Sequence, residues 1–119
     1  MQLIGAKLHL VEPGAVDISI PYREDLTQQN GYLHAGILAT VADSACGYAA
    51  HTLMPAEADV LSVEFKVNLL RPAMAETFVA EARVIKAGQT LTVTQCNVYG
   101  KTGEVSKLIA TMLATMIRK

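Results

Sequence analysis

"QQNGYLHAGILATVADSACGYAAHTLMP", residues 28–55, is the least polar long segment of the chain and decides its fold. From position 35 to about Leu53 it contains no proline, few β-branched residues and many alanines, which favours a helix of about five turns that ends before Pro55. Asp43, near the middle, is the only charged residue of the segment. The stretch therefore predicts one long apolar helix that carries a single carboxylate.

The faces of this helix differ in character. Apolar side chains cover most of its circumference, so we expect the helix to be enclosed by other elements rather than to lie on a surface. One narrow stripe is different, because its members follow each other at spacings of 4, 3, 4 and 4 residues: Gly36, Thr40, Asp43, Gly47 and His51. This face is small and polar, and it suits the close approach of another backbone.

Six further segments alternate between apolar and polar residues, as half-buried strands do. Two precede the helix, joined by a turn at Pro13-Gly14, and four follow it: residues 6–12, 15–22, 60–70, 76–86, 90–99 and 105–119. In the third segment the alternation predicts these inward-facing side chains: Leu61, Val63, Phe65, Val67 and Leu69. The predicted order is β-β-α-β-β-β-β.

Short turns between sequential strands indicate an antiparallel sheet. A single apolar helix then has to pack against the apolar face of the whole sheet. The compact solution is one α+β domain over residues 1–119, in which a long, curved sheet of about six strands wraps around a central helix. The outer face and the edge strands of such a sheet are free to pair with another copy. We therefore expect a homodimer or a homotetramer.

Composition argues against several classes of function. Lys plus Arg number 10 and Asp plus Glu 11, without a basic tract, so nucleic acid is not an expected partner. Residues 35–54 reach the length of a membrane span, but Asp43 at the centre would cost about 2.5 to 3.5 kcal/mol, so a membrane is not expected either. The start, "MQLIGAKLHL", lacks the features of a secretory signal, and the expected location is the cytoplasm.

The two cysteines indicate no metal or cofactor. Cys46 falls in the helix pattern and Cys96 in a strand pattern, and neither belongs to a CxxC or other metal-binding spacing. We therefore expect two buried free thiols in a reducing compartment, with no metal and no cofactor.

Asp43 has two interpretations on the residues alone. A carboxylate in an apolar helix loses hydration worth several kcal/mol unless something compensates, and perturbed carboxylates cluster at functional sites. The same residue is compatible with a structural carboxylate that is bonded to a nearby donor or exposed at the edge of the helix. Both interpretations stay open at this level.

The loop "NGYLHAG", residues 30–36, ends where the helix begins. This position directs the backbone N–H groups of Ala35 and Gly36 into the positive end of the helix dipole, which suits a substrate carbonyl that becomes an oxyanion during attack. The alternative is an ordinary helix start that uses Gly31 and Gly36 for tight turns. His34 by itself is more typical of a positioned structural histidine than of a catalyst.

Three stretches together resemble a known family: "GYLHAGILATVADSACGYAA", "LSVEFKVNLLRPA" and "VIKAGQTLTVTQCNVYGKTGEVSKLIATMLA". They are similar to the hotdog-fold acyl-CoA thioesterases of the PaaI-like and thioesterase superfamily member 2 type, over roughly residues 15 to 117. The most specific part is the pattern G-x-L-H-x-G followed by an acidic residue nine positions after the histidine, here His34 and Asp43. The resemblance implies a helix wrapped by an antiparallel sheet, with active sites at a dimer interface.

The resemblance also implies roles for catalytic residues. Asp43 would act as general base on water or as nucleophile on the thioester carbonyl. Ala35 stands where the family has the first glycine of an HGG motif, and its backbone N–H would polarise that carbonyl. Ser62, in "LSVEF", matches a serine that helps hold the attacking water or the substrate.

Further residues would bind or orient the substrate on the same basis. Gln28 falls where family members carry an Asn or Gln that orients the substrate or the water, although Asn30 is near enough to take that role instead. His34 and Gly36 belong to the loop at the start of the helix, and in this family the histidine usually braces that loop.

The phosphates of coenzyme A (CoA) require cations. The basic residues expected near the rim of the site are Lys66, Arg71 and Lys86, and Gly88 and Gln89 form the turn that follows. Each of these charges is individually also compatible with solvated surface.

The function that the resemblance implies is hydrolysis of an acyl-CoA, with an aromatic or medium-chain acyl group, to free acid and CoA. A thioester is activated enough to need only a positioned base or nucleophile and an oxyanion donor. Two alternatives stay open: a hydratase or dehydratase acting on acyl thioesters, and a non-catalytic module that binds acyl-CoA.

Overall fold

The central helix forms where the alanine-rich segment predicts it. In the computed structural model, which describes residues 2–119, α1 spans Ala35–His51. His34 caps its start, because the ring Nδ1 accepts a hydrogen bond of 2.9 Å from the backbone N–H of Gly36. The helix ends at His51 rather than near Leu53, and the Thr52 hydroxyl donates to the backbone carbonyl of Ala49 at 2.6 Å.

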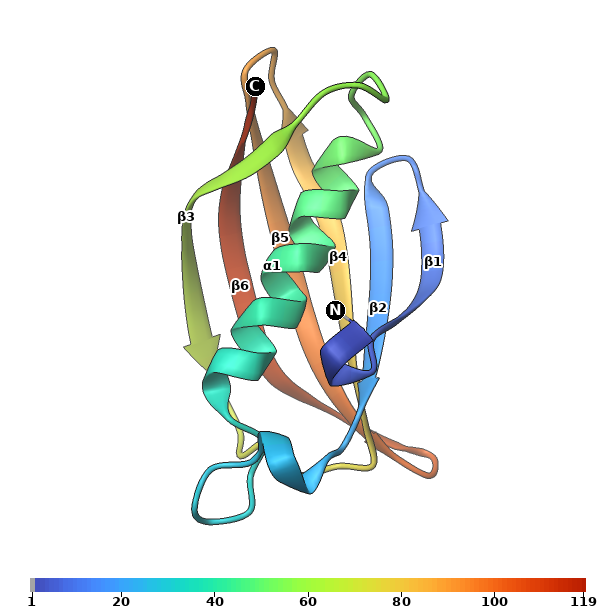
Figure 1. Cartoon of the computed structure of the whole chain (residues 1–119), viewed down its shortest axis with the longest axis vertical. Helices are drawn as coiled ribbons and strands as arrows, with labels where there is room; N and C mark the ends of the chain where they lie inside the picture. Colours follow the sequence, from blue (N-terminus) through green and yellow to red (C-terminus); the bar gives the residue numbers. More distant parts are fainter. Residues whose placement is uncertain (1) are drawn as a thin grey trace.

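Six strands form one antiparallel sheet with the order β1-β2-β4-β5-β6-β3 (Figure 1). Short 3-10 turns at Gln2–Ile4 and Glu24–Leu26 lie outside the sheet. The strands are β1 (Lys7–Glu12), β2 (Ala15–Pro21), β3 (Val60–Leu69), β4 (Thr77–Ala87), β5 (Leu91–Thr102) and β6 (Val105–Arg118). The predicted element order and the α+β hotdog fold are confirmed.

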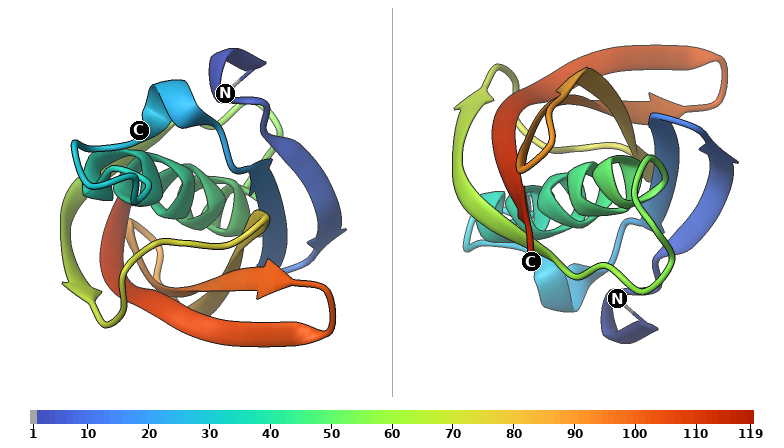
Figure 2. Two further views of the ribbon diagram at one scale, coloured as in Figure 1. Left: turned by 90° about the horizontal axis from the view of Figure 1, so that it is seen from below. Right: turned by 90° about the horizontal axis from the view of Figure 1, so that it is seen from above.

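The sheet curves around α1, as the end-on views show (Figure 2). Small side chains on the buried face of the helix, including Ala42, Ala45 and Ala49, allow close packing against the inner face of the sheet. The largest fully buried side chains include Phe78, Met112 and Met116, which come from strands. The core is therefore a single layer between one helix and one sheet.

The helix is not enclosed on all sides, and that prediction is wrong for the single chain. The sheet covers only one side of α1, whereas Gly36, Thr40 and Tyr48 on the other side are exposed. Asp43 and Gly47 belong to the same open face by their spacing and are half-buried. The prediction failed because the alanines, most of which are buried, dominate the apolar character of the helix, whereas the narrow stripe at Gly36, Thr40, Asp43 and Gly47 is the face that the sheet leaves open.

The inward pattern predicted for β3 is wrong in its first half, because the strand contains a bulge. The register shifts between Ser62 and Glu64, so one extra residue is inserted there. Ser62 pairs with the buried Met116 and therefore faces the helix, which turns Leu61 to the outer face. Val63, at the bulge, is exposed.

Beyond the bulge the predicted phase holds, but the side chains are less buried than expected. Phe65 pairs with the buried Ala114, so it lies on the helix side of the sheet together with Val67 and Leu69. Phe65 is nevertheless 45% exposed and Leu69 55% exposed. Because β3 is an edge strand, these side chains have no further strand to cover them.

Cys46 and Cys96 are buried free thiols, as predicted. Their mutual contact and their burial hold the pKa of the Cys96 thiol above its ordinary value, so this sulfur stays protonated. Within residues 2–119 no three His, Cys, Asp or Glu side chains come together as metal ligands. No helix in the same range is long and apolar enough to cross a membrane.

Candidate active site

The loop before α1 is held in one shape by its own hydrogen bonds. The Gln28 N–H donates to the Tyr32 carbonyl at 2.8 Å, and the Gly31 N–H donates to the Gln28 carbonyl at 3.0 Å. Gly31 has a φ of 84°, which favours glycine at this turn. The hydroxyl of Tyr22 donates to the Gly31 carbonyl at 2.8 Å and fixes the loop to the end of β2. The loop therefore presents Gln28 and His34 in a defined position.

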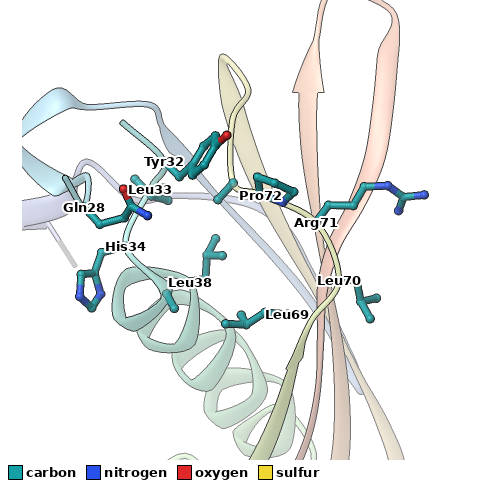
Figure 3. Close-up of a pocket in the computed structure, with 11 residues that line it drawn as sticks. Gln28, Tyr32, Leu33, His34, Leu38, Leu69, Leu70, Arg71 and Pro72 are labelled. Atoms are coloured by element: carbon teal, nitrogen blue, oxygen red, sulfur yellow. The ribbon is translucent and has the colours of Figure 1, made fainter. Parts of the chain in front are cut away.

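This loop, the start of α1 and the end of β3 enclose a cavity of about 480 Å³, which we call the donor cavity (Figure 3). Its wall is apolar on the β3 side and polar on the loop side. The lining residues are Gln28, Tyr32, Leu33, His34, Ala35, Leu38, Leu69, Leu70, Arg71, Pro72 and Ala73.

The donor cavity contains an unused backbone donor. The His34 ring accepts a hydrogen bond from the Gly36 N–H, and the His34 carbonyl accepts hydrogen bonds from the N–H groups of Ile37 and Leu38. Within residues 2–119 no acceptor binds the Ala35 N–H, which lies at the positive end of α1. No residue other than glycine has a positive φ in this range, so alanine fits this position without strain. The predicted oxyanion donor is therefore free to bind a ligand.

Gln28 and Asn30, the two candidates for an orienting amide, take different positions in the loop. Gln28 lines the donor cavity, and its side-chain oxygen accepts the backbone N–H of Asn30. Asn30 is exposed and does not line the cavity. Gln28 therefore lines the same cavity as Ala35, whereas Asn30 does not, and the role of either amide in orienting substrate stays a prediction.

Asp43 lies in a second cavity, of about 380 Å³, which we call the carboxylate cavity. The Ser62 hydroxyl donates to Asp43 Oδ1 at 2.5 Å, which joins α1 to β3 across the open face of the helix. The bulge in β3 turns Ser62 toward this contact. The lining residues are Asp43, Ser44, Gly47, Tyr48, His51, Ala58, Asp59, Val60, Ser62 and Met116.

The two cavities share no lining residue. Ala35 and Asp43 are eight residues apart on one helix, which corresponds to about 12 Å along its axis. A base or nucleophile and an oxyanion donor must each come within about 3 Å of the same reacting group. Within one chain, the predicted oxyanion donor and the predicted catalytic carboxylate therefore lie too far apart to act on the same group.

The residues predicted to bind the CoA phosphates lie at two separate places in the chain's structure. Arg71 lines the donor cavity, with its guanidinium turned toward β6 (Figure 3), where Nη1 donates to the Leu108 carbonyl at 2.7 Å. Lys86 lies near the end of β4, and Gly88 and Gln89 lie in the turn that leads to β5, at the opposite end of the molecule (Figure 1). Gly88 is required there, because a Cβ would come within 2.5 Å of the Leu91 carbonyl oxygen.

Two cavity residues were not singled out from the sequence. Tyr32 lines the donor cavity, and Tyr48 lines the carboxylate cavity and is 50% exposed. Tyr32 belongs to the "NGYLHAG" loop and Tyr48 follows Gly47 of the polar stripe. A tyrosine beside each motif was therefore a sequence feature that could have identified both as cavity residues.

Residues 30–107 match the Thioesterase superfamily model, which is more than half of the chain. The chain belongs to the thioesterase superfamily and is, by that membership, a thioester hydrolase with a hotdog fold. A thioesterase family protein from Silicibacter pomeroyi has a crystal structure similar to this one, with a TM-score of 0.97 and 51% sequence identity. That similarity covers 99% of this chain and 87% of the other.

The more specific resemblance to PaaI-like members is also confirmed. A mutant form of the phenylacetic acid degradation protein PaaI from Thermus thermophilus has a TM-score of 0.86 and 25% identity, and the match covers 100% of this chain and 97% of that chain. Human acyl-coenzyme A thioesterase 13 is 34% identical over 101 residues, which is 82% of this chain and 69% of the human protein.

An archaeal relative, named "Putative esterase", comes from Saccharolobus solfataricus and is 33% identical over 94 residues. The match covers 79% of this chain and 66% of the relative. The chain therefore spans about two thirds of the length of this archaeal protein.

Proposed function

We propose that the protein hydrolyses acyl-CoA thioesters to a carboxylic acid and CoA. The observation that carries this proposal is the pair of complementary half-sites, an unused N–H at Ala35 and a carboxylate at Asp43 that is held by Ser62. The apolar walls of the two cavities provide room for an acyl group and for the pantetheine arm. Family membership and the names of relatives support the same reaction class.

The proposed chemistry follows from what each group can do. The Ala35 N–H donates to the thioester oxygen and stabilises the negative charge that develops there. Asp43 either takes a proton from the attacking water or attacks the carbonyl carbon itself, in which case water later cleaves the resulting anhydride. The carbon–sulfur bond breaks, and the CoA thiolate leaves and is protonated. Ser62 and Gln28 would orient the water and the substrate.

The complete site requires a second copy of the chain. If two α1 helices pack antiparallel about a two-fold axis at the level of Ala39, Ala35 of one chain lies beside the partner's Asp43, because each is four residues from that axis. The open face of small residues permits this close approach, and the exposed apolar side of β3 at Phe65 and Leu69 supplies surface to bury. We propose a homodimer, alone or within a homotetramer, as the active form.

The same symmetry offers a site for CoA. An antiparallel pairing brings the β4–β5 turn of one chain toward the donor-cavity end of the other, so that Lys86 and Arg71 could act together on its phosphates. Gly88 and Gln89 would then supply backbone and amide contacts. The two free thiols fit a reducing compartment, and we propose the cytoplasm as the location.

Replacing Gly47 with Leu should weaken dimerisation and activity together. A Cβ at this position would meet no atom within 4 Å, so the backbone accepts a side chain here, and leucine would project into the carboxylate cavity and over the helix face. We expect the dissociation constant of the dimer to rise about tenfold or more. Sedimentation velocity over a dilution series and thiol release measure the two effects. Glu104→Leu, at the exposed β5–β6 turn, is the control, and unchanged assembly with full activity of Gly47→Leu would contradict the interface placement.

The direct test of the proposed function is a panel of acyl-CoA thioesters that includes medium-chain, branched and aromatic acyl groups. We expect release of free CoA thiol, well above the rate without enzyme, for at least one of them. If every member of the panel gives only the background rate, the proposed function is wrong.

A further inference from the structure

The tip of the loop before α1 is a small unit whose hydrogen bonds are mostly internal. The Gln28 N–H donates to the Tyr32 carbonyl, and the Gly31 N–H donates to the Gln28 carbonyl. The Gln28 side chain also accepts the N–H of Asn30. We call residues 28–32 the flap. It projects beyond the start of α1 (Figure 1), and two of its side chains, Gln28 and Tyr32, line the donor cavity.

Tyr22 makes the one hydrogen bond that joins the flap to the other parts of the chain within residues 2–119. Its hydroxyl donates to the Gly31 carbonyl at 2.8 Å, whereas every other hydrogen bond of the flap begins and ends inside it. Gly31 is the residue with φ of 84°, so the bond is made at the turn of the flap and not at its base. Without this bond the flap is attached only at its two ends.

The two ends of the flap are anchored independently of this bond. The Leu33 N–H donates to the Ala73 carbonyl at 2.9 Å, and the His34 N–H donates to the Leu26 carbonyl at 2.9 Å. These contacts hold the start of α1 in place whether or not the flap is docked. The flap is therefore a local unit that can move without unfolding the helix.

Tyr22 is itself held firmly. Its ring packs against the hydrophobic core, and its backbone N–H donates to the Glu76 carbonyl at 3.0 Å. The hydroxyl is therefore presented to the flap from a fixed position, as a group that orients a functional loop should be. Phenylalanine keeps this packing and removes only the donor.

We infer that Tyr22 is a positioning residue for thioester hydrolysis. By holding the Gly31 turn it holds Gln28 and Tyr32 against the donor cavity, and so fixes the wall that faces a thioester bound at the Ala35 N–H. Tyr22 lines neither the donor cavity nor the carboxylate cavity, so it acts through the flap and touches no reacting atom. This inference rests on the proposed function, because it concerns the same site.

Tyr22→Phe should lower kcat/KM for the best acyl-CoA of the panel about five- to tenfold, which is the effect that the loss of one hydrogen bond allows. Tyr99→Phe is the matched control, because Tyr99 belongs to β5 and lines neither cavity. It also removes one hydroxyl from a half-buried ring, and it should leave kcat/KM unchanged.

Two further measurements separate positioning from a general loosening of the fold. In a Gln28→Ala background the positioned amide is missing, so Tyr22→Phe should lower kcat/KM by less than about twofold. Hydrogen exchange measured by mass spectrometry should become faster in peptides that cover residues 28–32, and stay unchanged in peptides from β5.

Three results overturn this inference while leaving thioester hydrolysis in place: an unchanged kcat/KM in Tyr22→Phe, an equal loss in both backgrounds, or unchanged exchange in residues 28–32. Absence of turnover with the whole acyl-CoA panel overturns the proposed function, and this inference with it.

Discussion

Asp43→Asn is expected to lower kcat for thioester hydrolysis by about 10³-fold while leaving acyl-CoA binding within a few-fold of its original strength. The amide has nearly the shape of the carboxylate and can still accept the Ser62 hydrogen bond, but it is a poor base and a poor nucleophile. Steady-state thiol release gives kcat, and calorimetric titration with a non-hydrolysable acyl-CoA analogue gives the affinity.

Asp25→Asn is the matched control, because this carboxylate pairs with Arg23 on the surface, 62% exposed. It should hydrolyse at the original rate. Near-normal turnover in Asp43→Asn would remove the carboxylate from the mechanism. Binding without turnover in the unmodified protein would instead identify a module that binds acyl-CoA without cleaving it.

Ala35→Pro should lower kcat by about 10²- to 10³-fold with little change in the thermal stability of the protein. Proline has no N–H, so the substitution deletes the proposed oxyanion donor. Ala35 is the first residue of α1, where proline is well tolerated, and His34 before it has φ −62° and ψ 136°, a conformation compatible with a following proline. No hydrogen bond within residues 2–119 is lost, because none uses this N–H.

Ala35→Ser separates the loss of the donor from a change of shape. Serine keeps the N–H, so this variant should lose far less activity than the proline variant. Circular dichroism and thermal unfolding check that all three proteins are folded to the same extent. A folded Ala35→Pro protein with full activity would show that another group stabilises the oxyanion.

Much of the fold was accessible from local patterns. The alanine-rich run from Ala35 predicted the helix, and alternation predicted all six strands, because each pattern follows from the geometry of one element. The bulge after Ser62 could not be predicted from the sequence, because apolar and polar residues alternate as regularly around Leu61 and Val63 as they do from Phe65 to Leu69. A one-residue insertion in a strand changes pairing rather than composition, so only the neighbouring strand reveals it.

The candidate site was accessible in part. Asp43 was conspicuous as the only charge of an apolar helix, but its contact with Ser62 joins residues 19 positions apart on different elements. Spacing alone does not predict such a contact, and only the family resemblance pointed to it. The preference for Gln28 over Asn30 depends on the closed shape of the loop. The contact of His51 with the Ala58 carbonyl involves a loop after α1, and no sequence periodicity predicts the path of that loop.

The central claim is that each active site combines Ala35 of one chain with the partner's Asp43. It is tested by joining the two inactive variants, Ala35→Pro and Asp43→Asn, in one dimer that carries a different affinity tag on each chain. Tandem purification isolates the mixed dimer, in which one site has both defects and the other has neither. We predict about half of the unmodified activity per dimer, because one of its two sites is intact. A mixed dimer no more active than the two parent variants would contradict a site shared between chains.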